Sequence, residues 1–138
     1  MKRFILFVFS LVMLASMPKV EAKNHVFTGS IGPYKIHMVL NDQMQGYYYY
    51  DNRPKSHFKL VLTSQRDCAF EEHGSKEACY KLTLQEYAPG GKNSGQFVGT
   101  YKSAYEYGYI GSEFTGVFTN KSNGKRYSFE VYCSEKAR

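Results

Sequence analysis

Three cysteines carry the first chemistry that the sequence suggests. Cys68 lies within a polar segment, residues 65–78, Cys79 directly follows it, and Cys133 lies near the C-terminus. A disulfide between Cys68 and Cys79 would close this segment into a loop, so we expect that bridge and a free Cys133. A Cys68–Cys133 bridge is the alternative. If inward-facing Leu62 pairs with inward-facing Leu84, the register of the two strands places Cys68 opposite Ala78 and not opposite Cys79. The favoured pairing therefore requires a bulge in one strand.

The same segment also contains residue types that bind metals. Cys68, His73 and Cys79 are close together in the sequence, beside Glu71 and Glu72, and zinc prefers thiolate and imidazole ligands. The spacing matches no common zinc motif. We therefore expect a disulfide here, with no metal site and no cofactor.

No catalytic motif accompanies these residues. The four histidines stand outside any recognisable motif, and the Gly-x-Ser-x-Gly, His-Glu-x-x-His and phosphate-loop patterns do not occur. Glu106 and Glu113 are carboxylates of the kind that glycosidases use, but nothing in the sequence brings them together. We therefore predict that the protein is not an enzyme.

Tyrosine is the residue type best suited to ligand binding in this chain, which contains 13 Tyr and no Trp. Tyr47 and Tyr49 share the outward face of one predicted strand, and Tyr107 and Tyr109 share that of another. Exposed Tyr rings stack on sugars or pack against protein partners. These four tyrosines are the predicted ligand-binding residues, expected as two separate pairs. The alternative is that they only form cross-strand pairs within a sheet.

Strand patterns must position these residues, because no helix-period run of useful length appears. Apolar and polar residues alternate in most strands, and short turn sequences such as Gly32-Pro33 and Asn123-Gly124 connect them. About eight strands are predicted, at residues 26–31, 34–40, 44–51, 57–64, 79–87, 94–103, 107–119 and 127–133.

A repeated Phe-x-Gly-x-apolar pattern predicts how these strands curve. It occurs at residues 27–31, 97–101 and 114–118, and in a looser form at 44–48. Its glycine lies on the core face, where it lets a strand bend or another backbone approach. Short connections make neighbouring strands antiparallel. The sequence therefore predicts an all-β fold, an antiparallel up-and-down meander that is closed or strongly coiled into a barrel, with a two-sheet sandwich as the alternative.

The N-terminal segment is typical of a secretory signal peptide. Lys2 and Arg3 precede an almost wholly apolar run that ends at Met17, and Val20 and Ala22 are suitable for a cleavage site. The run is shorter than the ~20 residues that a membrane span needs. We predict a signal peptide over residues 1–22, and one β-barrel domain without a membrane span over residues 23–138. The protein would then be periplasmic or secreted.

The stretch from Phe27 to Leu40, followed by the Gly-Tyr-Tyr-Tyr-Tyr sequence of residues 46–50, resembles a recurring type of short exported bacterial protein of unknown function. The predicted architecture is also similar to the calycin barrels, the lipocalins and avidins. The chain lacks the first-strand Gly-x-Trp of lipocalins and the Trp residues of avidin-type sites. The resemblance therefore implies a fold and carries over no functional residue.

Charge and composition narrow the classes of partner and of function that the sequence predicts. The formal net charge of the whole sequence is +6, and removing Lys2, Arg3, Lys19 and Glu21 with the signal peptide takes 18 basic and 12 acidic residues to 15 and 11, a net charge of +4. This charge is a mild bias toward anionic partners, and no Lys/Arg run typical of nucleic-acid binding occurs in the sequence. Export, the absence of catalytic motifs and the surplus of tyrosine predict a non-enzymatic binding module that recognises a cell-envelope glycan or a small apolar ligand. The alternative is a protein-partner module, such as a hydrolase inhibitor, that acts through the 65–78 loop.

Overall fold

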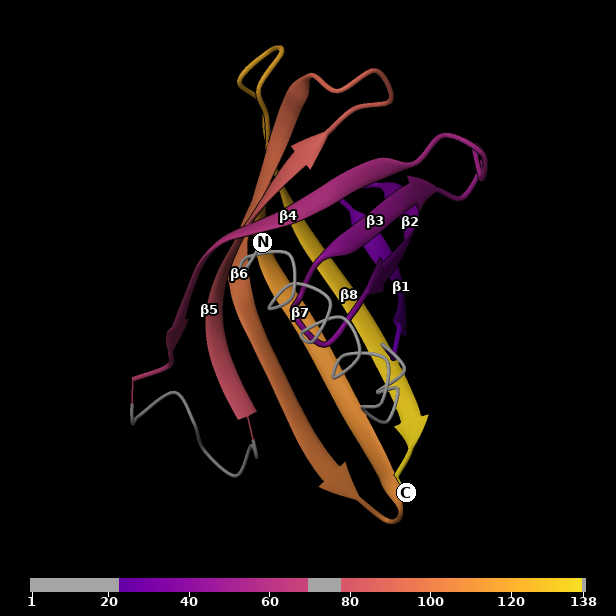
Figure 1. Ribbon diagram of the computed structural model, residues 1–138, viewed down its shortest axis with the longest axis vertical. Coiled ribbons are helices and arrows are strands. Elements are labelled where there is room, and N and C mark those ends of the chain that lie inside the picture. The colour runs from indigo at the N-terminus through magenta and orange to yellow at the C-terminus, as the bar shows by residue number, and fades with distance from the viewer. Residues whose placement is uncertain (1–22, 70–77, 138) are drawn as a thin grey trace, which may run out of the picture.

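The computed structural model describes residues 23–69 and 78–137, which form eight strands (Figure 1). The predicted signal peptide, residues 1–22, and most of the 65–78 loop lie outside the described residues. In chain order the strands are β1 (His25–Ile31), β2 (Tyr34–Leu40), β3 (Gly46–Tyr50), β4 (Phe58–Asp67), β5 (Ala78–Tyr87), β6 (Asn93–Glu106), β7 (Tyr109–Asn120) and β8 (Arg126–Lys136).

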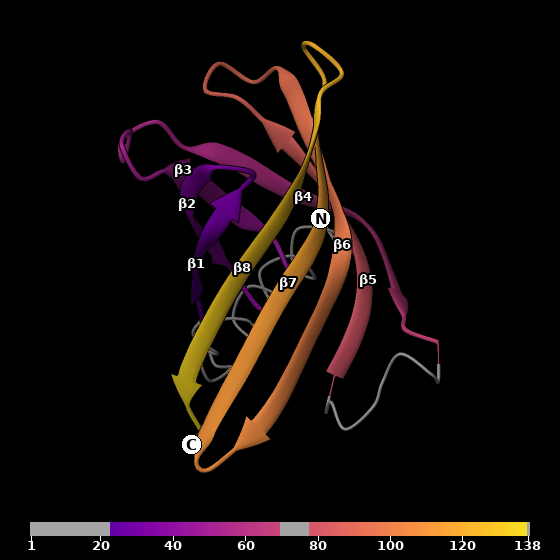
Figure 2. The ribbon, with the colours of Figure 1, turned by 180° about the vertical axis from the view of Figure 1, so that it is seen from behind.

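The strands form a closed antiparallel barrel in which each strand pairs with its neighbours in the sequence. β8 closes the barrel against β1, with Thr28 paired to Tyr132 and Ile31 paired to Phe129. Seen from both sides, β6, β7 and β8 extend beyond β1, β2 and β3 at the lower end of the molecule (Figure 1 and Figure 2). The prediction of an all-β up-and-down barrel is confirmed, and the two-sheet sandwich is wrong.

Alternate side chains fill the interior of the barrel, and most of them are large and apolar. The ring of Phe97 lies near the centre, 4.8 Å from the ring of Phe118, 5.0 Å from Phe129 and 5.3 Å from Tyr48, measured between centroids. Two of these three pairs meet edge to face, an arrangement that aromatic rings prefer. The largest fully buried side chains are Phe27, Ile31, Ile36, Met38, Leu40, Tyr48, Leu60, Leu82, Leu84, Phe97, Phe114 and Val131.

The glycines of the repeated pattern lie where a neighbouring backbone comes close. A Cβ atom added at Gly99 would be 2.8 Å from the carbonyl carbon of Thr115, and one at Gly116 would be 2.9 Å from that of Val98. Gly99 and Gly116 are paired with each other across β6 and β7. Each strand therefore needs a glycine where it faces the other, and the predicted role of the pattern in close backbone approach is confirmed.

The predicted boundary between the sixth and seventh strands needs a correction. β6 continues to Glu106 and β7 begins at Tyr109, so Tyr107 lies in a two-residue hairpin turn and not in a strand. Tyr107 and Gly108 have φ angles of 50° and 84°, the left-handed conformation that type I′ hairpin turns require. The turn lacks the Asn or Asp that usually starts it, and the alternating tyrosines around it are compatible with a continuous strand. For this reason the sequence pattern did not reveal it.

Candidate ligand-binding site

A pocket of about 290 Å³ opens at one end of the barrel. The rings of Tyr34, Tyr50 and Phe58 form its walls, and the loop between β3 and β4 forms its rim, with Arg53 among the lining residues. Small-molecule sites in proteins usually measure ~300–1,000 Å³, and this pocket lies at the lower limit of that range, a size that suits a single ring or a short apolar group. It lies at the end of the barrel that carries the β1–β2, β3–β4, β5–β6 and β7–β8 turns, the upper end in Figure 1.

The three rings of the pocket support one another. Tyr34 and Tyr50 meet at 87° with centroids 6.2 Å apart, and Tyr50 and Phe58 meet at 89° with centroids 5.8 Å apart. Behind them, buried Tyr48 stacks on Phe58 at 5.1 Å. The side chain of Tyr34 is 54% exposed. The pocket therefore has a rigid inner wall and one outer ring that can still bury more surface against a ligand.

Backbone hydrogen bonds hold the loop that forms the rim. The amide of Arg53 donates to the carbonyl of Tyr50 at 2.8 Å, and the amide of Ser56 donates to the carbonyl of Arg53 at 3.1 Å. The amide of Asp51 donates to the carbonyl of Lys35 at 3.0 Å, which ties the loop to β2. The side chain of Arg53 is exposed and forms no ion pair with a carboxylate of the described residues. Its guanidinium group is thus available at the edge of the pocket.

A buried carboxyl group lies behind the pocket wall. The side chain of Glu86 is 3% exposed. It accepts hydrogen bonds from the hydroxyls of Tyr48 and Ser94, the latter at 2.6 Å. Burial raises the pKa of Glu86 above the ordinary carboxyl value in spite of these two hydrogen bonds, and burial also raises the pKa of Tyr48. Because Tyr48 stacks on Phe58, the carboxyl is close to the pocket but separated from it by aromatic rings.

The strand pattern contained the signal for this carboxyl group, although our sequence analysis missed it. Leu82 and Leu84 point inward, and Glu86 follows at the same period of two. A charged residue at an inward position of a filled barrel must find partners there, because an unpaired buried charge is costly. Two hydroxyl donors meet that requirement.

Tyr47 and Tyr49, two of the predicted ligand-binding residues, stack with histidines on the outside of the barrel. The ring of Tyr47 lies 4.4 Å from His57 and is nearly parallel to it, at 7°. The ring of Tyr49 lies 5.1 Å from His37 and 5.3 Å from His57. Both tyrosines are half-buried. Their faces are already covered by imidazole rings, so they offer less free area to a ligand than the sequence suggested.

Tyr107 and Tyr109, the other two predicted residues, lie at the opposite end of the barrel from the pocket, in and beside the β6–β7 turn (Figure 1). Their side chains are 91% and 53% exposed. The structure therefore separates this pair from Tyr47 and Tyr49. Neither pair lines the pocket formed by Tyr34, Tyr50 and Phe58 at the mouth of the barrel, which we call the mouth pocket. Ligand binding by either pair remains a prediction.

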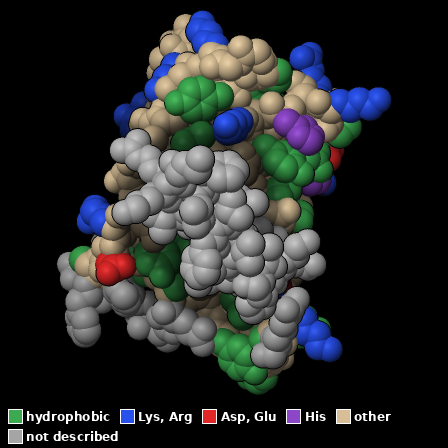
Figure 3. Space-filling view, in the orientation of Figure 1, with side chains coloured by type: hydrophobic (Ala, Val, Ile, Leu, Met, Phe, Trp, Pro, Cys, Tyr) green, Lys and Arg blue, Asp and Glu red, His purple; other side chains and the backbone are tan. Residues whose placement is uncertain are grey.

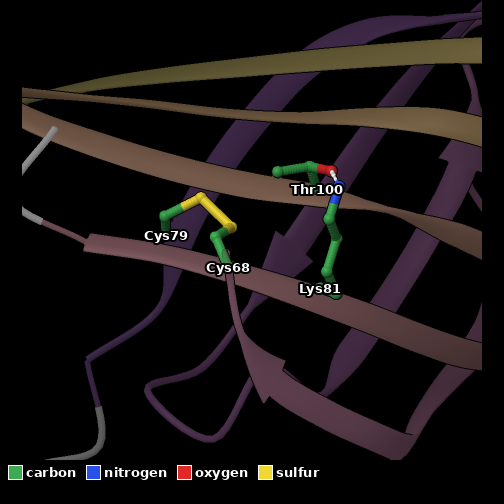
Figure 4. The surroundings of a disulfide bond; sticks show 4 residues. All are labelled: Cys68, Cys79, Lys81 and Thr100. Atoms are coloured by element: carbon green, nitrogen blue, oxygen red, sulfur yellow. Dashed lines mark hydrogen bonds between the residues drawn. A yellow bond between two sulfur atoms is a disulfide. The ribbon is translucent and has the colours of Figure 1, made fainter. Parts of the chain in front are cut away.

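Cys68 and Cys79 form a disulfide, with their Cα atoms 5.4 Å apart (Figure 4). Leu62 pairs with Leu84 as the sequence suggested, but the register of β4 against β5 then shifts by one residue. This bulge brings the two cysteines opposite each other, and the backbone amide of Cys68 donates a hydrogen bond to the carbonyl of Cys79 at 3.2 Å. The predicted pairing and its bulge are confirmed. The alternative bridge is wrong, and sulfur atoms bonded to each other cannot serve as the thiolate ligands of a zinc ion.

Cys133 is free and buried, as expected, beside a polar cluster that ties strand ends together. Burial, reinforced by Glu135, raises the pKa of the Cys133 thiol to about 12. The imidazole of His25 bridges Glu135, at 2.9 Å, and Asp42, at 2.7 Å, and Lys23 lies 3.2 Å from Glu135. Burial alone lowers the pKa of His25, but the two carboxylates raise it above its ordinary value. This cluster connects β1, β8 and the β2–β3 loop.

No protein-family model matches the chain, and no curated protein or solved structure is significantly similar to it. The closed barrel is compatible with a calycin-like architecture. Within residues 23–69 and 78–137, no three His, Cys, Asp or Glu side chains come together to hold a metal ion. In the same part of the chain, no helix is long and apolar enough to cross a bilayer.

Proposed function

We propose that this protein is an exported, non-enzymatic binding protein whose ligand occupies the pocket at the mouth of the barrel. The observation that carries the proposal is the arrangement of Tyr34, Tyr50 and Phe58 around a concave space of about 290 Å³. Sites for small molecules are concave and mostly apolar, with a few polar groups that orient the ligand. Here Arg53 is such a group. A small apolar molecule, or a single sugar ring of an envelope glycan, would bind by stacking on these walls.

The mouth pocket suits a small ligand better than the tyrosines selected from the sequence. Tyr47 and Tyr49 use their faces to stack with histidines, and Tyr107 projects from a turn with 91% of its side chain exposed. A concave site buries more of a ligand than a projecting ring does. We therefore propose binding at the mouth, with the Tyr107–Tyr109 pair as the competing site.

The reactive groups of the described residues support binding over catalysis. Glu86 is buried behind the aromatic wall, and the raised pKa of Cys133 keeps its thiol protonated at neutral pH, which makes it a poor nucleophile. We propose on these grounds that the ligand is bound without being transformed.

Export is part of the proposal. The Cys68–Cys79 disulfide supports it, because disulfides persist in oxidising compartments, and the apolar N-terminal segment supports it independently. A periplasmic or secreted location would bring the pocket within reach of envelope glycans and amphiphiles. The alternative of a hydrolase inhibitor that acts through the 65–78 loop is favoured by no observation, since most of that loop lies outside the described residues.

Titration with N-phenyl-1-naphthylamine, an uncharged dye that fluoresces in apolar surroundings, tests the mouth pocket. Tyr34→Ala removes one wall of the pocket. Tyr109→Ala is a matched control at the competing site, because the two side chains are 54% and 53% exposed. We expect Tyr34→Ala to weaken dye binding about tenfold, since a lost stacking ring is worth roughly 1.4 kcal/mol. Tyr109→Ala should leave binding unchanged.

The opposite pattern, with weaker binding in Tyr109→Ala and normal binding in Tyr34→Ala, would move the site to the β6–β7 turn. Failure of the unmodified protein to bind the dye in a saturable way would refute the proposal that the pocket binds apolar groups. Once saturable binding is established, displacement of the dye by soluble envelope glycan fragments or by small apolar molecules distinguishes the two ligand classes.

A further inference from the structure

Exposed cations surround the mouth of the barrel. They come from three different loops and from the first residue of β8, and all their side chains are exposed. In the space-filling view of Figure 3, most of the visible Lys and Arg side chains, coloured blue, lie toward this end of the molecule, the upper end of the picture. We call this group the basic rim, and its members are Arg53, Lys55, Lys92, Lys121, Lys125 and Arg126.

The loops of the basic rim are in contact with one another. Arg53 and Lys55 line a shallow groove together with Pro89, which belongs to the β5–β6 loop. The amide of Lys121, after β7, donates to the carbonyl of Ser94 at the start of β6 at 3.0 Å. Charges that are far apart in the sequence therefore lie at the same end of the barrel, and two of them, Arg53 and Lys55, line the groove itself.

These cations are not neutralised by the residues around them. The only carboxylate in the β3–β4, β5–β6 and β7–β8 loops is that of Asp51. The imidazole of His37, 2.7 Å away, and the charge of Lys35 lower the pKa of Asp51 and engage its negative charge. Within the described residues, no member of the basic rim forms an ion pair. Uncompensated charge around an opening attracts anions into it.

Arg53 joins the basic rim to the aromatic pocket. It lines the pocket with Tyr34, Tyr50 and Phe58, and it also lines the adjoining groove with Lys55. A guanidinium group binds carboxylate, phosphate or sulfonate through two parallel hydrogen bonds, which fixes direction as well as charge. The pocket thus offers an apolar wall and an anion-binding group on the same opening.

We infer that the ligand of the mouth pocket is a small anionic amphiphile. Its apolar or ring-shaped part lies among the aromatic side chains, and its carboxylate, phosphate or sulfonate group meets Arg53, with Lys55 and the rest of the basic rim attracting it from solution. The inference rests on the proposed function and names the class of ligand. An uncharged sugar would stack on the aromatic walls of the pocket but would leave the basic rim without an anionic partner.

Two dyes with one skeleton test the inference. N-phenyl-1-naphthylamine is uncharged, and 8-anilino-1-naphthalenesulfonate is the same molecule with one added sulfonate. We expect the sulfonate dye to bind about tenfold more tightly at low salt, and its affinity to fall with added NaCl while that of the uncharged dye does not. Arg53→Gln should remove most of this preference, and Lys55→Gln a smaller part. Arg66→Gln is the matched control, because Arg66 is an exposed arginine of β4 that lies outside the mouth pocket and its adjoining groove.

The outcomes separate the inference from the proposed function. If neither dye binds, or if Tyr34→Ala leaves the uncharged dye unaffected, the proposed function fails and the inference fails with it. If the uncharged dye binds and loses affinity in Tyr34→Ala, but the sulfonate adds nothing or Arg53→Gln changes both dyes equally, only the anionic class is wrong. Binding to phosphatidylglycerol vesicles that monomeric dodecyl phosphate does not displace would show a bilayer source and overturn the assignment of a free amphiphile.

Discussion

Replacing Gly99 by alanine would place a methyl group against the backbone of the neighbouring strand. The added Cβ atom would lie 2.8 Å from the carbonyl carbon of Thr115 and 2.9 Å from the ring of Phe129. Nonbonded carbon atoms are normally about 3.5–4.0 Å apart, so β6 and β7 would have to separate locally by ~1 Å. This perturbation is small in volume, but it acts on backbone, which cannot rotate out of the way as a side chain can.

The expected loss of stability follows from two effects. Overpacking of this kind costs roughly 1–3 kcal/mol, and each interstrand hydrogen bond weakened by the separation is worth about 1 kcal/mol. We therefore expect the free energy of unfolding to fall by about 2–4 kcal/mol in Gly99→Ala. Gly111→Ala is the control on the same strand pair, because a Cβ atom at Gly111 meets nothing within 4 Å. Its effect should stay within about 0.5 kcal/mol.

Urea unfolding followed by far-UV circular dichroism measures both variants, since the midpoint shifts when stability changes at a constant slope. Tyrosine fluorescence gives an independent signal in a chain without Trp. If Gly99→Ala unfolds at the same urea concentration as Gly111→Ala, close backbone approach does not constrain the barrel. Our explanation of the repeated glycine pattern would then be wrong.

Four further predictions concern ionisable groups and thiols. Burial raises the pKa of Glu86, so the folded state binds the proton of this carboxyl group more tightly than the unfolded chain does, and the free energy of unfolding should fall as pH rises from 4.5 through the raised pKa. The urea midpoint of Glu86→Gln should depend less on pH over that range than the midpoint of the unmodified protein. The same pH dependence in both proteins would contradict this prediction. The pKa of His25 is also raised, so its contribution should be fully present below pH 6.5 and be lost as pH rises through the raised value, a dependence that His25→Gln should lack in the same assay. Replacing Cys68 and Cys79 by serine should cost about 3 kcal/mol in urea unfolding, as expected for a short closed loop. In the unmodified protein, a thiol titration after unfolding should find Cys133 alone, and a second free thiol would contradict the disulfide.

Local patterns were sufficient to predict the strands and much of the core. Alternation at period two assigns Phe129 and Val131 to the interior and Tyr132 to the exterior from the sequence alone, and the structure agrees. The same rule places Glu86 inside, a signal that our sequence analysis missed. Turn chemistry was less dependable, as the Tyr107–Gly108 turn shows, because only the pairing of β6 with β7 decides where the chain reverses.

The sequence by itself determined the all-β class, the antiparallel order and the inward faces, because each depends on neighbours along the chain. It favoured the Cys68–Cys79 pair, and the bulge between β4 and β5 decided for it. Only the tertiary structure decided where a ligand has room. Tyr34, Tyr50 and Phe58 begin or end three different strands. The basic rim collects its six cations from three loops and the first residue of β8, which are spread over residues 53–126. Barrel closure brings alternate turns to the same end, and the distance between them depends on how tightly the interior is filled. That distance is a property of all eight strands together, so no single segment of the sequence could reveal the pocket or the charge around it.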